Sequence, residues 1–364
     1  MLFFYVLGLA VFAQGMSEFM LSGLVPDIAR DLSVSVGASA SLTSAYAVGM
    51  VVGAPVMAAL SARWPRRRAL VVFLVVFVAV HVLGALTDDF VVLFGTRVVA
   101  AVANAGFLAV AMSVVGARGT AVLIGGITLA CVAGVPGGAV LGQLFGWRSA
   151  FWAVAALCLP ALVLVLRSAP AEAAGPRDAD LGAEVRVLRS RPLLRTLVLA
   201  VLVNGATFAT FAYLAVVATD VAGLSPSLVP AVLAAFGAGA CAGVTTASRL
   251  VGVRLKVVLA VLPAGWVVLA LVGEHVVALF LVTAIVGVLS FGAGSALVAR
   301  VMNLADGAPT LGGAYATVAL NVGAVIGPLL GAFAGTGVAW VSAVLAACAT
   351  AFALPRPRVR QDGS

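Results

Sequence analysis

Apolar runs of about 20 residues, the length that crosses a bilayer as an α-helix, recur along the whole of this sequence. Charged residues make up only 9% of the chain, whereas a soluble domain carries roughly 25%. Such a surface cannot have water as its main solvent. The sequence therefore predicts an all-α membrane protein.

Twelve spans are predicted. They cover residues 2–24, 39–60, 69–86, 90–116, 120–143, 150–167, 195–217, 227–248, 255–273, 276–299, 310–333 and 337–354. The first run lacks a basic segment before it and a clean small-residue cleavage site, and it contains Glu18. We therefore interpret it as a span rather than a signal peptide.

Basic residues gather in alternate connections, after the second, sixth, eighth and twelfth predicted spans. The positive-inside rule then places both termini and the long central connection in the cytoplasm, which suits a multi-pass protein of the inner membrane. The predicted organisation is a six-helix bundle at 1–167, a cytoplasmic linker at 168–192, a second bundle at 193–354 and a cytoplasmic tail at 355–364. Topology also accounts for the net charge of +8, so we expect no nucleic-acid partner.

The two halves repeat at a nearly fixed offset. Gln14-Gly15 matches Asn204-Gly205, and the pair Gly49 and Gly53 matches Gly239 and Gly243, each 190 residues on. A third series matches at 189, with Gly134, Gly138 and Gly142 against Gly323, Gly327 and Gly331. Glycines spaced by four line one helix face and let helices approach closely, although they can serve packing alone. Two parallel six-helix halves are typical of the major facilitator architecture.

Several segments resemble drug:proton antiporters of the major facilitator superfamily, and specifically bacterial chloramphenicol-resistance exporters. They are Ser17–Met20 with Gly23–Ala29 in the first span, Gly134–Gly138 with Gly146–Arg148 near the fifth, Val203–Phe208 in the seventh, and Asp306–Gly313. The resemblance implies two pseudo-symmetric six-helix bundles and proton-coupled efflux of a small drug, most simply chloramphenicol, by a monomer in lipid. It also implies an antiporter motif of Gly134, Pro136, Gly137, Gly138 and Gly142, a membrane arginine at Arg97, and a cytoplasmic gate loop with Arg63, Arg66 and Arg67. Ala62 stands where the family usually has an acid, which removes one gating salt bridge.

Glu18 is the only one of the thirteen acidic residues predicted inside a span. An intramembrane ionisable group is a candidate functional site, and burial disfavours its charged form, so it suits a proton carrier. Arg97 is predicted at a similar depth, roughly 10 Å below the outer surface at 1.5 Å per residue. Three alternatives stay open: Arg97 holds Glu18 ionised, binds carbonyls of neighbouring helices, or snorkels to the interface.

A drug cavity needs apolar and aromatic walls with a few polar groups. Asn204, Phe208 and Phe211 fall on one helix face, and Phe208 is the counterpart of Glu18 in the repeat. The full predicted substrate set is Glu18, Met20, Tyr46, Asn104, Asn204, Phe208, Phe211, Tyr213 and Asn321. An exporter of a sugar, amino acid or other metabolite with the same fold is the alternative function.

Residues for enzyme chemistry are sparse in this sequence. His81 and His275 are the only histidines, and no nucleophile–base pair, metal-ligand spacing or phosphate-binding glycine loop occurs. We expect no metal or other cofactor and no enzyme activity. Cys131, Cys158, Cys241 and Cys348 lie in apolar runs and are predicted to be small core residues.

Three connections are shorter than in the family, at 115–120, 249–254 and 333–337. Loop tips concentrate disorder, so these positions suggest that residues are missing from the chain. The alternative is an exporter with unusually short loops and a continuous backbone.

Overall fold

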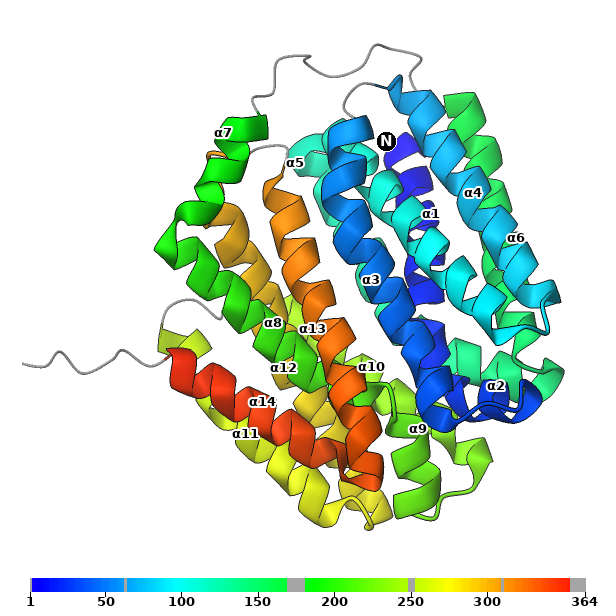
Figure 1. Ribbon diagram of the computed structural model, residues 1–364, viewed down its shortest axis with the longest axis vertical. Coiled ribbons are helices and arrows are strands. Elements are labelled where there is room, and N and C mark those ends of the chain that lie inside the picture. The colour runs from blue at the N-terminus through cyan, green and yellow to red at the C-terminus, as the bar shows by residue number, and fades with distance from the viewer. Residues whose placement is uncertain (1, 62–63, 169–180, 248–252, 309–310, 354–364) are drawn as a thin grey trace, which may run out of the picture.

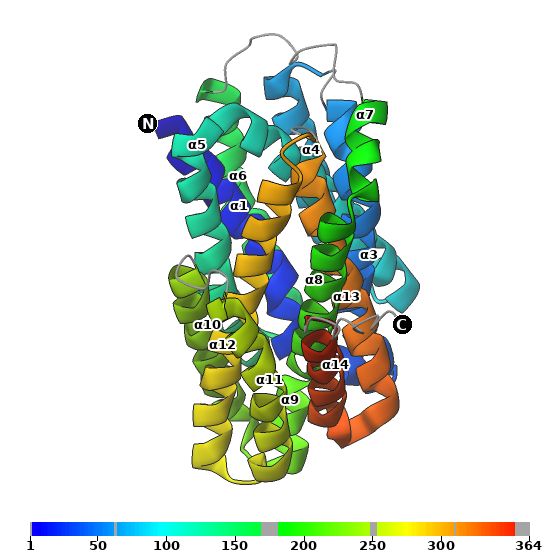
Figure 2. The same cartoon turned by 90° about the vertical axis from the view of Figure 1, so that its left-hand side faces the viewer.

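The computed structural model describes residues 2–61, 64–168, 181–247, 253–308 and 311–353, and its regular elements there are all helical (Figures 1 and 2). In the first half they are α1 (Leu2–Phe19) with the 3-10 turn Met20–Gly23, α2 (Val25–Asp31), α3 (Val36–Ser61), α4 (Arg66–Leu86), α5 (Phe90–Phe145) and α6 (Arg148–Ser168). The second half has α7 (Leu181–Arg186), α8 (Arg191–Phe211), α9 (Leu214–Val216), α10 (Val229–Thr246), α11 (Val253–Val272), α12 (Val276–Leu304), α13 (Gly312–Ala334) and α14 (Val338–Ala353).

The outer faces of the long helices are apolar. Phe333 is 91% exposed, and Val91 and Val277 are more than 70% exposed, on helices whose other faces pack inward. Exposed side chains of this kind are stable in lipid and not in water. This is a multi-pass membrane protein.

Within the described ranges, ten helical stretches are long and apolar enough to cross a membrane, where the sequence predicts twelve spans. The difference lies at two short connections. Spans 90–116 and 120–143 fall in the single helical element α5, of which Phe90–Met112 qualifies and the apolar stretch Ala133–Phe145 is too short. Spans 310–333 and 337–354 form one stretch, Gly312–Ala353, because only the 3-10 turn Gly335–Gly337 separates α13 from α14.

Helix α5 reverses direction along its length. Gly49 and Gly53 of α3 face Val98 and Val102, so α3 runs parallel to the first part of α5. The last part of α5 runs parallel to α1 instead, with Gly134 near Met16 and Gly138 near Met20.

Helices α1 and α3 are antiparallel, since the Ser39 hydroxyl near the start of α3 donates to the Val25 carbonyl just after α1. The two ends of α5 therefore run in opposite directions, and the turn is visible where the α5 ribbon folds over in Figure 1. One helical element thus crosses the molecule twice.

The predicted repeat recurs in the packing. α3 meets α5 through Gly49 and Gly53, and α10 meets α12 through Gly239 and Gly243 in the same way. α1 meets the last part of α5, and α8 correspondingly meets α13, where Gly323 and Gly327 approach the backbone of Gly205. The two halves touch mainly through α3 against α13 and α5 against α10.

The end of the predicted linker contains the short helix α7. The Glu184 side chain of α7 is buried, and its carboxylate accepts a hydrogen bond of 2.8 Å from the Leu311 backbone N–H at the start of α13. The Tyr315 hydroxyl donates to the Glu184 carbonyl at 2.9 Å. A carboxylate at a helix N-terminus is favoured by the helix dipole, so α7 docks on the α12–α13 end (Figure 1). Residues 169–180 and the tail 355–364 lie outside the described residues.

The cysteines are core residues only in part. Cys158 is fully buried and Cys241 partly buried, but Cys348 is exposed on α14. The prediction is wrong for Cys348 because a membrane helix also has an apolar face that meets lipid. The side chain of Cys131 lies outside the described part.

Two of the three short connections lie in described backbone. Residues 115–120 continue α5, and 333–337 close with the turn between α13 and α14. Whether residues are missing from these connections stays a prediction. Residues 248–252 lie outside the described ranges.

Candidate functional site

Arg97 lies at the centre of a buried polar cluster in the first half. Its Nη2 donates to the Ser17 carbonyl of α1 at 2.7 Å, and its Nη1 donates to the Ser17 hydroxyl at 2.8 Å. The guanidinium also stacks over the Tyr46 ring of α3, 4.7 Å from its centroid, and lies 5.6 Å from the Phe151 centroid. Among the three alternatives for Arg97, the geometry agrees with binding to a carbonyl of a neighbouring helix. The Arg97 side chain is 1% exposed, so it does not extend to the membrane interface.

Glu18 is the neighbour of Ser17 and is partly buried. It lies within electrostatic range of Arg97 and Tyr46, but no ion pair within 4.0 Å joins it to Arg97 among the described contacts. The carboxylate is therefore close to a fixed positive charge without being bound to it.

Tyr46 and Asn104 complete the cluster. The Asn104 amide donates to the Tyr46 hydroxyl at 2.8 Å and contacts the Met50 sulfur at 3.8 Å. Arg97 and Asn104 are seven residues apart on α5 and both contact Tyr46, as their predicted common face requires. These two predicted substrate residues thus lie beside the predicted proton site.

Three further polar residues of the cluster were not selected from the sequence. Ser17 and His81 are bonded to each other at 2.6 Å between Oγ and Nε2, and both are buried. Gln14 lies one turn before Glu18 and is fully buried, and its amide has no hydrogen-bond partner among the described residues. The available signal was the polar residue spacing 14, 17, 18 on one face of the first span.

The predicted residues of the second half bind α13. The Asn204 amide donates to the Leu320 carbonyl at 2.6 Å, and the Tyr213 hydroxyl donates to the Pro328 carbonyl at 3.1 Å. Asn321 donates to Thr317 within its own helix. These side chains hold α8 against α13, and Asn204 and Asn321 lie near each other along that contact.

Phe208 and Phe211 are buried rather than turned to lipid. Their ring centroids are 5.5 Å apart, and Phe211 stacks on Phe236 of α10 at 4.8 Å. They belong to an apolar cluster that also contains Phe19 and Ala139 from the first half. Their position between the halves suits a wall of a substrate path, and whether they touch substrate stays a prediction.

Met20 is placed in a packing contact. It is 1% exposed, and its backbone and Cβ face Gly138 of α5. The predicted antiporter motif explains why, because Gly134, Gly138 and Gly142 form the surface on which α1 rests, and Gly137 lies near Met16. Pro136 is inside α5. The motif thus sets how close α1, with Glu18, lies to α5.

An ion cluster ties the opposite end of the first half together. Arg148 bridges Asp31 of α2 and Asp88 before α5, with 2.5 Å to the Asp88 carboxylate, and the Trp147 indole donates to Asp31 at 2.9 Å. The hydrogen bond from Trp147, followed by that from Arg148, lowers the pKa of Asp31 below its ordinary 3.8. The Gly146–Arg148 segment therefore closes the connection between α5 and α6.

We expect Asp31 to contribute stability above pH 3.8, which is lost as the pH falls through its lowered pKa. The Asp31→Asn variant should melt a few degrees lower at pH 7, corresponding to less than about 1 kcal/mol because the pair is half exposed. The difference in melting temperature between this variant and the wild type should disappear as the pH falls toward 3, as measured by melting curves in detergent. Asp220→Asn, at an exposed position, is the control and should follow the wild type. A difference in melting temperature that does not change with pH would contradict the stabilising role of ionised Asp31.

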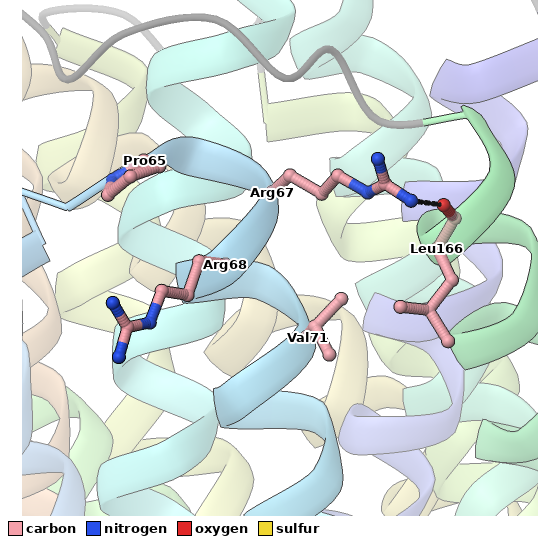
Figure 3. Close-up of a pocket in the computed structure, with 5 residues that line it drawn as sticks. All are labelled: Pro65, Arg67, Arg68, Val71 and Leu166. Carbon is pink, nitrogen blue, oxygen red and sulfur yellow. Dashed lines mark hydrogen bonds between the residues drawn. The ribbon is translucent and has the colours of Figure 1, made fainter.

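The predicted cytoplasmic gate loop binds within its own half. Arg67 donates to the Leu166 carbonyl at the end of α6, beside a shallow pocket of about 340 Å³ that Pro65, Arg68 and Val71 also line (Figure 3). Arg68 points away from this bond in Figure 3. Arg67 therefore ties α4 to α6, and a role of this loop in gating stays a prediction. Arg63 lies outside the described residues, and the gating role of Arg66 stays a prediction.

Among the described residues, no group of three or more His, Cys, Asp or Glu side chains is placed to hold a metal ion.

Comparison with known proteins agrees with this architecture. Residues 7–319 match the Major Facilitator Superfamily. The chain is 50% identical to a chloramphenicol resistance protein of Streptomyces lividans, over 96% of this chain and 95% of that protein. It is 32% identical to the inner membrane transport protein YdhP of Escherichia coli K12, over 89% and 86%.

The fold is also similar to a crystal structure of a bacterial homolog of the human lysosomal transporter Spinster in an inward-facing, unoccupied conformation. The TM-score is 0.77 at 16% identity, covering 96% of this chain and 95% of that one. The alignment with the Streptomyces protein runs over 372 residues, more than the 364 of this chain, so that protein has residues without a counterpart here.

Proposed function

Because the chain belongs to the major facilitator superfamily, we propose that it exports chloramphenicol or a closely related small drug across the inner membrane in exchange for protons. The observation that carries the substrate is the 50% identity with a chloramphenicol resistance protein over nearly the whole of both chains. Transporter relatives and the lipid-facing helices favour transport over enzyme activity.

We infer twelve spans in two six-helix bundles at 1–167 and 193–354, with both termini in the cytoplasm. The reversal within α5 and the short turn between α13 and α14 supply the two crossings beyond the ten long stretches. The repeated α3–α5 and α10–α12 packing supports two equivalent bundles. Alternating access would then rock one bundle against the other along the α3–α13 and α5–α10 contacts.

Glu18 is the proton carrier in this proposal. Protonation from outside removes its charge beside Arg97 and weakens the binding of drug, which leaves. Deprotonation to the cytoplasm restores the drug site. Tyr46 and Asn104 in the first half, with Asn204, Phe208, Phe211, Tyr213 and Asn321 in the second, are the proposed contacts of the drug.

The test is expression in a chloramphenicol-sensitive host and uptake into inverted membrane vesicles. Expression should raise the tolerated chloramphenicol concentration, and vesicles should accumulate radiolabelled drug only while a proton gradient is present. An uncoupler should abolish the accumulation. Vesicles that accumulate a sugar or amino acid from a substrate panel, and no chloramphenicol, would replace this function with metabolite export.

A further inference from the structure

His81 is a buried titratable group that the proposed transport cycle does not use. It lies in α4, is 1% exposed, and contacts three other helices. Its ring is 4.2 Å from the Phe77 ring and 5.9 Å from the Phe151 ring of α6, centroid to centroid. Both ring nitrogens have polar partners, so the residue is held in one orientation.

The partners fix which nitrogen carries the proton. Nδ1 lies 2.7 Å from the Phe77 carbonyl oxygen, which can only accept, so Nδ1 carries the hydrogen. Nε2 lies 2.6 Å from the Ser17 hydroxyl and 3.4 Å from Nη1 of Arg97. A second proton on Nε2 would place an imidazolium against the guanidinium in a buried site, which is strongly unfavourable. His81 is therefore neutral, and Nε2 accepts.

A neutral His81 orients Ser17. The Ser17 hydroxyl donates its single hydrogen to Nε2 and so presents its lone pairs to Arg97, whose Nη1 donates to it at 2.8 Å. The chain of hydrogen bonds runs from the Phe77 carbonyl through His81 and Ser17 to Arg97, and Nη2 of Arg97 binds the Ser17 carbonyl.

The consequence concerns Glu18, which follows Ser17 directly in α1. Nη1 and Nη2 both donate to Ser17, which fixes the position of the guanidinium near Glu18, and no ion pair joins the two side chains among the described contacts. The ionisable groups around this chain of bonds are Glu18 on α1, Tyr46 on α3, Arg97 on α5 and Cys158 on α6. Tyr46 and Arg97 are bonded within the cluster, whereas no hydrogen bond or ion pair joins Glu18 or Cys158 to it among the described contacts.

We propose that His81 is a positioning residue for the proton-coupling site: as a neutral Nδ1–H ring it orients Ser17, which holds Arg97 off Glu18. This rests on the proposed proton coupling through Glu18. Without the His81 acceptor, the Ser17 hydroxyl turns away, Nη1 is released, and Arg97 pairs with the carboxylate. The ionised form of Glu18 then gains an adjacent opposite charge.

The first experiment compares two amides at position 81. Gln places an acceptor near the position of Nε2, whereas Asn reaches only as far as Nδ1. In proteoliposomes, the pH midpoint of chloramphenicol–proton exchange should shift to lower pH by about one unit in His81→Asn and in Ser17→Ala, the size expected for a new ion pair. His81→Gln should keep the wild-type midpoint. Unshifted midpoints in both His81→Asn and Ser17→Ala would overturn the positioning role.

The second experiment does not depend on transport. In the His275→Gln background His81 is the single histidine, so its ¹⁵N resonances are directly assigned. They should show the neutral Nδ1–H tautomer from pH 5 to 9, and the Nε2 resonance should move in Ser17→Ala. A cationic ring at pH 6, or the Nε2–H tautomer, would overturn the inference even if the wild type carries another substrate. If the wild type exchanges no proton for chloramphenicol, the proposed function fails and the spectra alone decide the hydrogen-bond chain.

Discussion

The Glu18→Gln variant should no longer accumulate drug against a gradient. One pH unit across the membrane is worth about 1.4 kcal/mol per proton, or about tenfold in the drug concentration ratio. Gln keeps the size and hydrogen-bonding capacity of the side chain but cannot take up or release the proton. The steady-state ratio in inverted vesicles should therefore fall from at least about tenfold to about one at this gradient.

Drug binding should be weaker in the Glu18→Gln variant but still measurable, because the neutral amide mimics protonated Glu18 while the other proposed contacts are intact. Equilibrium binding in detergent measures this. The matched control is Glu274→Gln, the same change at an exposed position between α11 and α12, which should transport as the wild type does. Retention of the wild-type ratio by Glu18→Gln would exclude Glu18 as the proton carrier.

Substitution of Gly239 should have the largest effect on folding. A Cβ at this position of α10 would lie 2.1 Å from the carbonyl oxygen of Ala284 in α12, and also within 3.1 Å of the Ala284 Cα. Carbon atoms pack at about 3.5–4.0 Å, and the atoms met here are backbone, so the two helices must separate. Gly239→Ala should cost at least the ~1–3 kcal/mol typical of overpacking, and Gly239→Val should yield little folded protein.

The control lies on the partner helix. A Cβ at Gly294 of α12 meets no atom within 4 Å, so Gly294→Ala should be neutral or raise the stability by roughly 0.5–1 kcal/mol through helix propensity. Gly49, the counterpart of Gly239 in the repeat, would meet the Val98 carbonyl oxygen at 2.4 Å and should behave like Gly239. Melting temperatures followed by size-exclusion chromatography give the comparison. A Gly239→Ala variant as stable as Gly294→Ala would show that these helices can separate without cost.

The effect of Glu18 on transport and the effect of glycine substitutions on folding are connected, because both depend on helices that pack through glycine faces. The last part of α5 approaches α1 so closely that a Cβ added at Gly138 would lie 2.9–3.0 Å from the Met20 backbone. Glu18 is half a turn away from that contact, and Arg97 reaches the same turn of α1 from the first part of α5. Close helix packing therefore sets the distance between the carboxylate and the guanidinium, and a change in this packing should change coupling as well as stability.

The membrane helices, their glycine faces and the two charged candidate residues can be predicted from the sequence alone. Apolar length defines the membrane helices, because a bilayer has a fixed thickness, and the described helix bounds differ from the predicted ones by a few residues at most ends. The glycine spacing of four also predicted helix faces that allow close approach, and Gly49 and Gly239 lie on such faces. Glu18 and Arg97 stand out because charge inside a span is costly.

The tertiary structure decided the rest, since it depends on which atoms meet across helices. Hydropathy cannot tell that α5 turns back while its backbone stays helical, or that α7 docks through Glu184. It likewise cannot show that Arg97 binds Ser17 instead of Glu18, or that Arg67 is bound to the end of α6. Sequence spacing gives the face of one helix, but the partner of a hydrogen bond comes from another helix, often more than 60 residues away. His81 is a lone histidine in an apolar run, and its proposed role rests on hydrogen bonds that only the packing of α4 against other helices reveals.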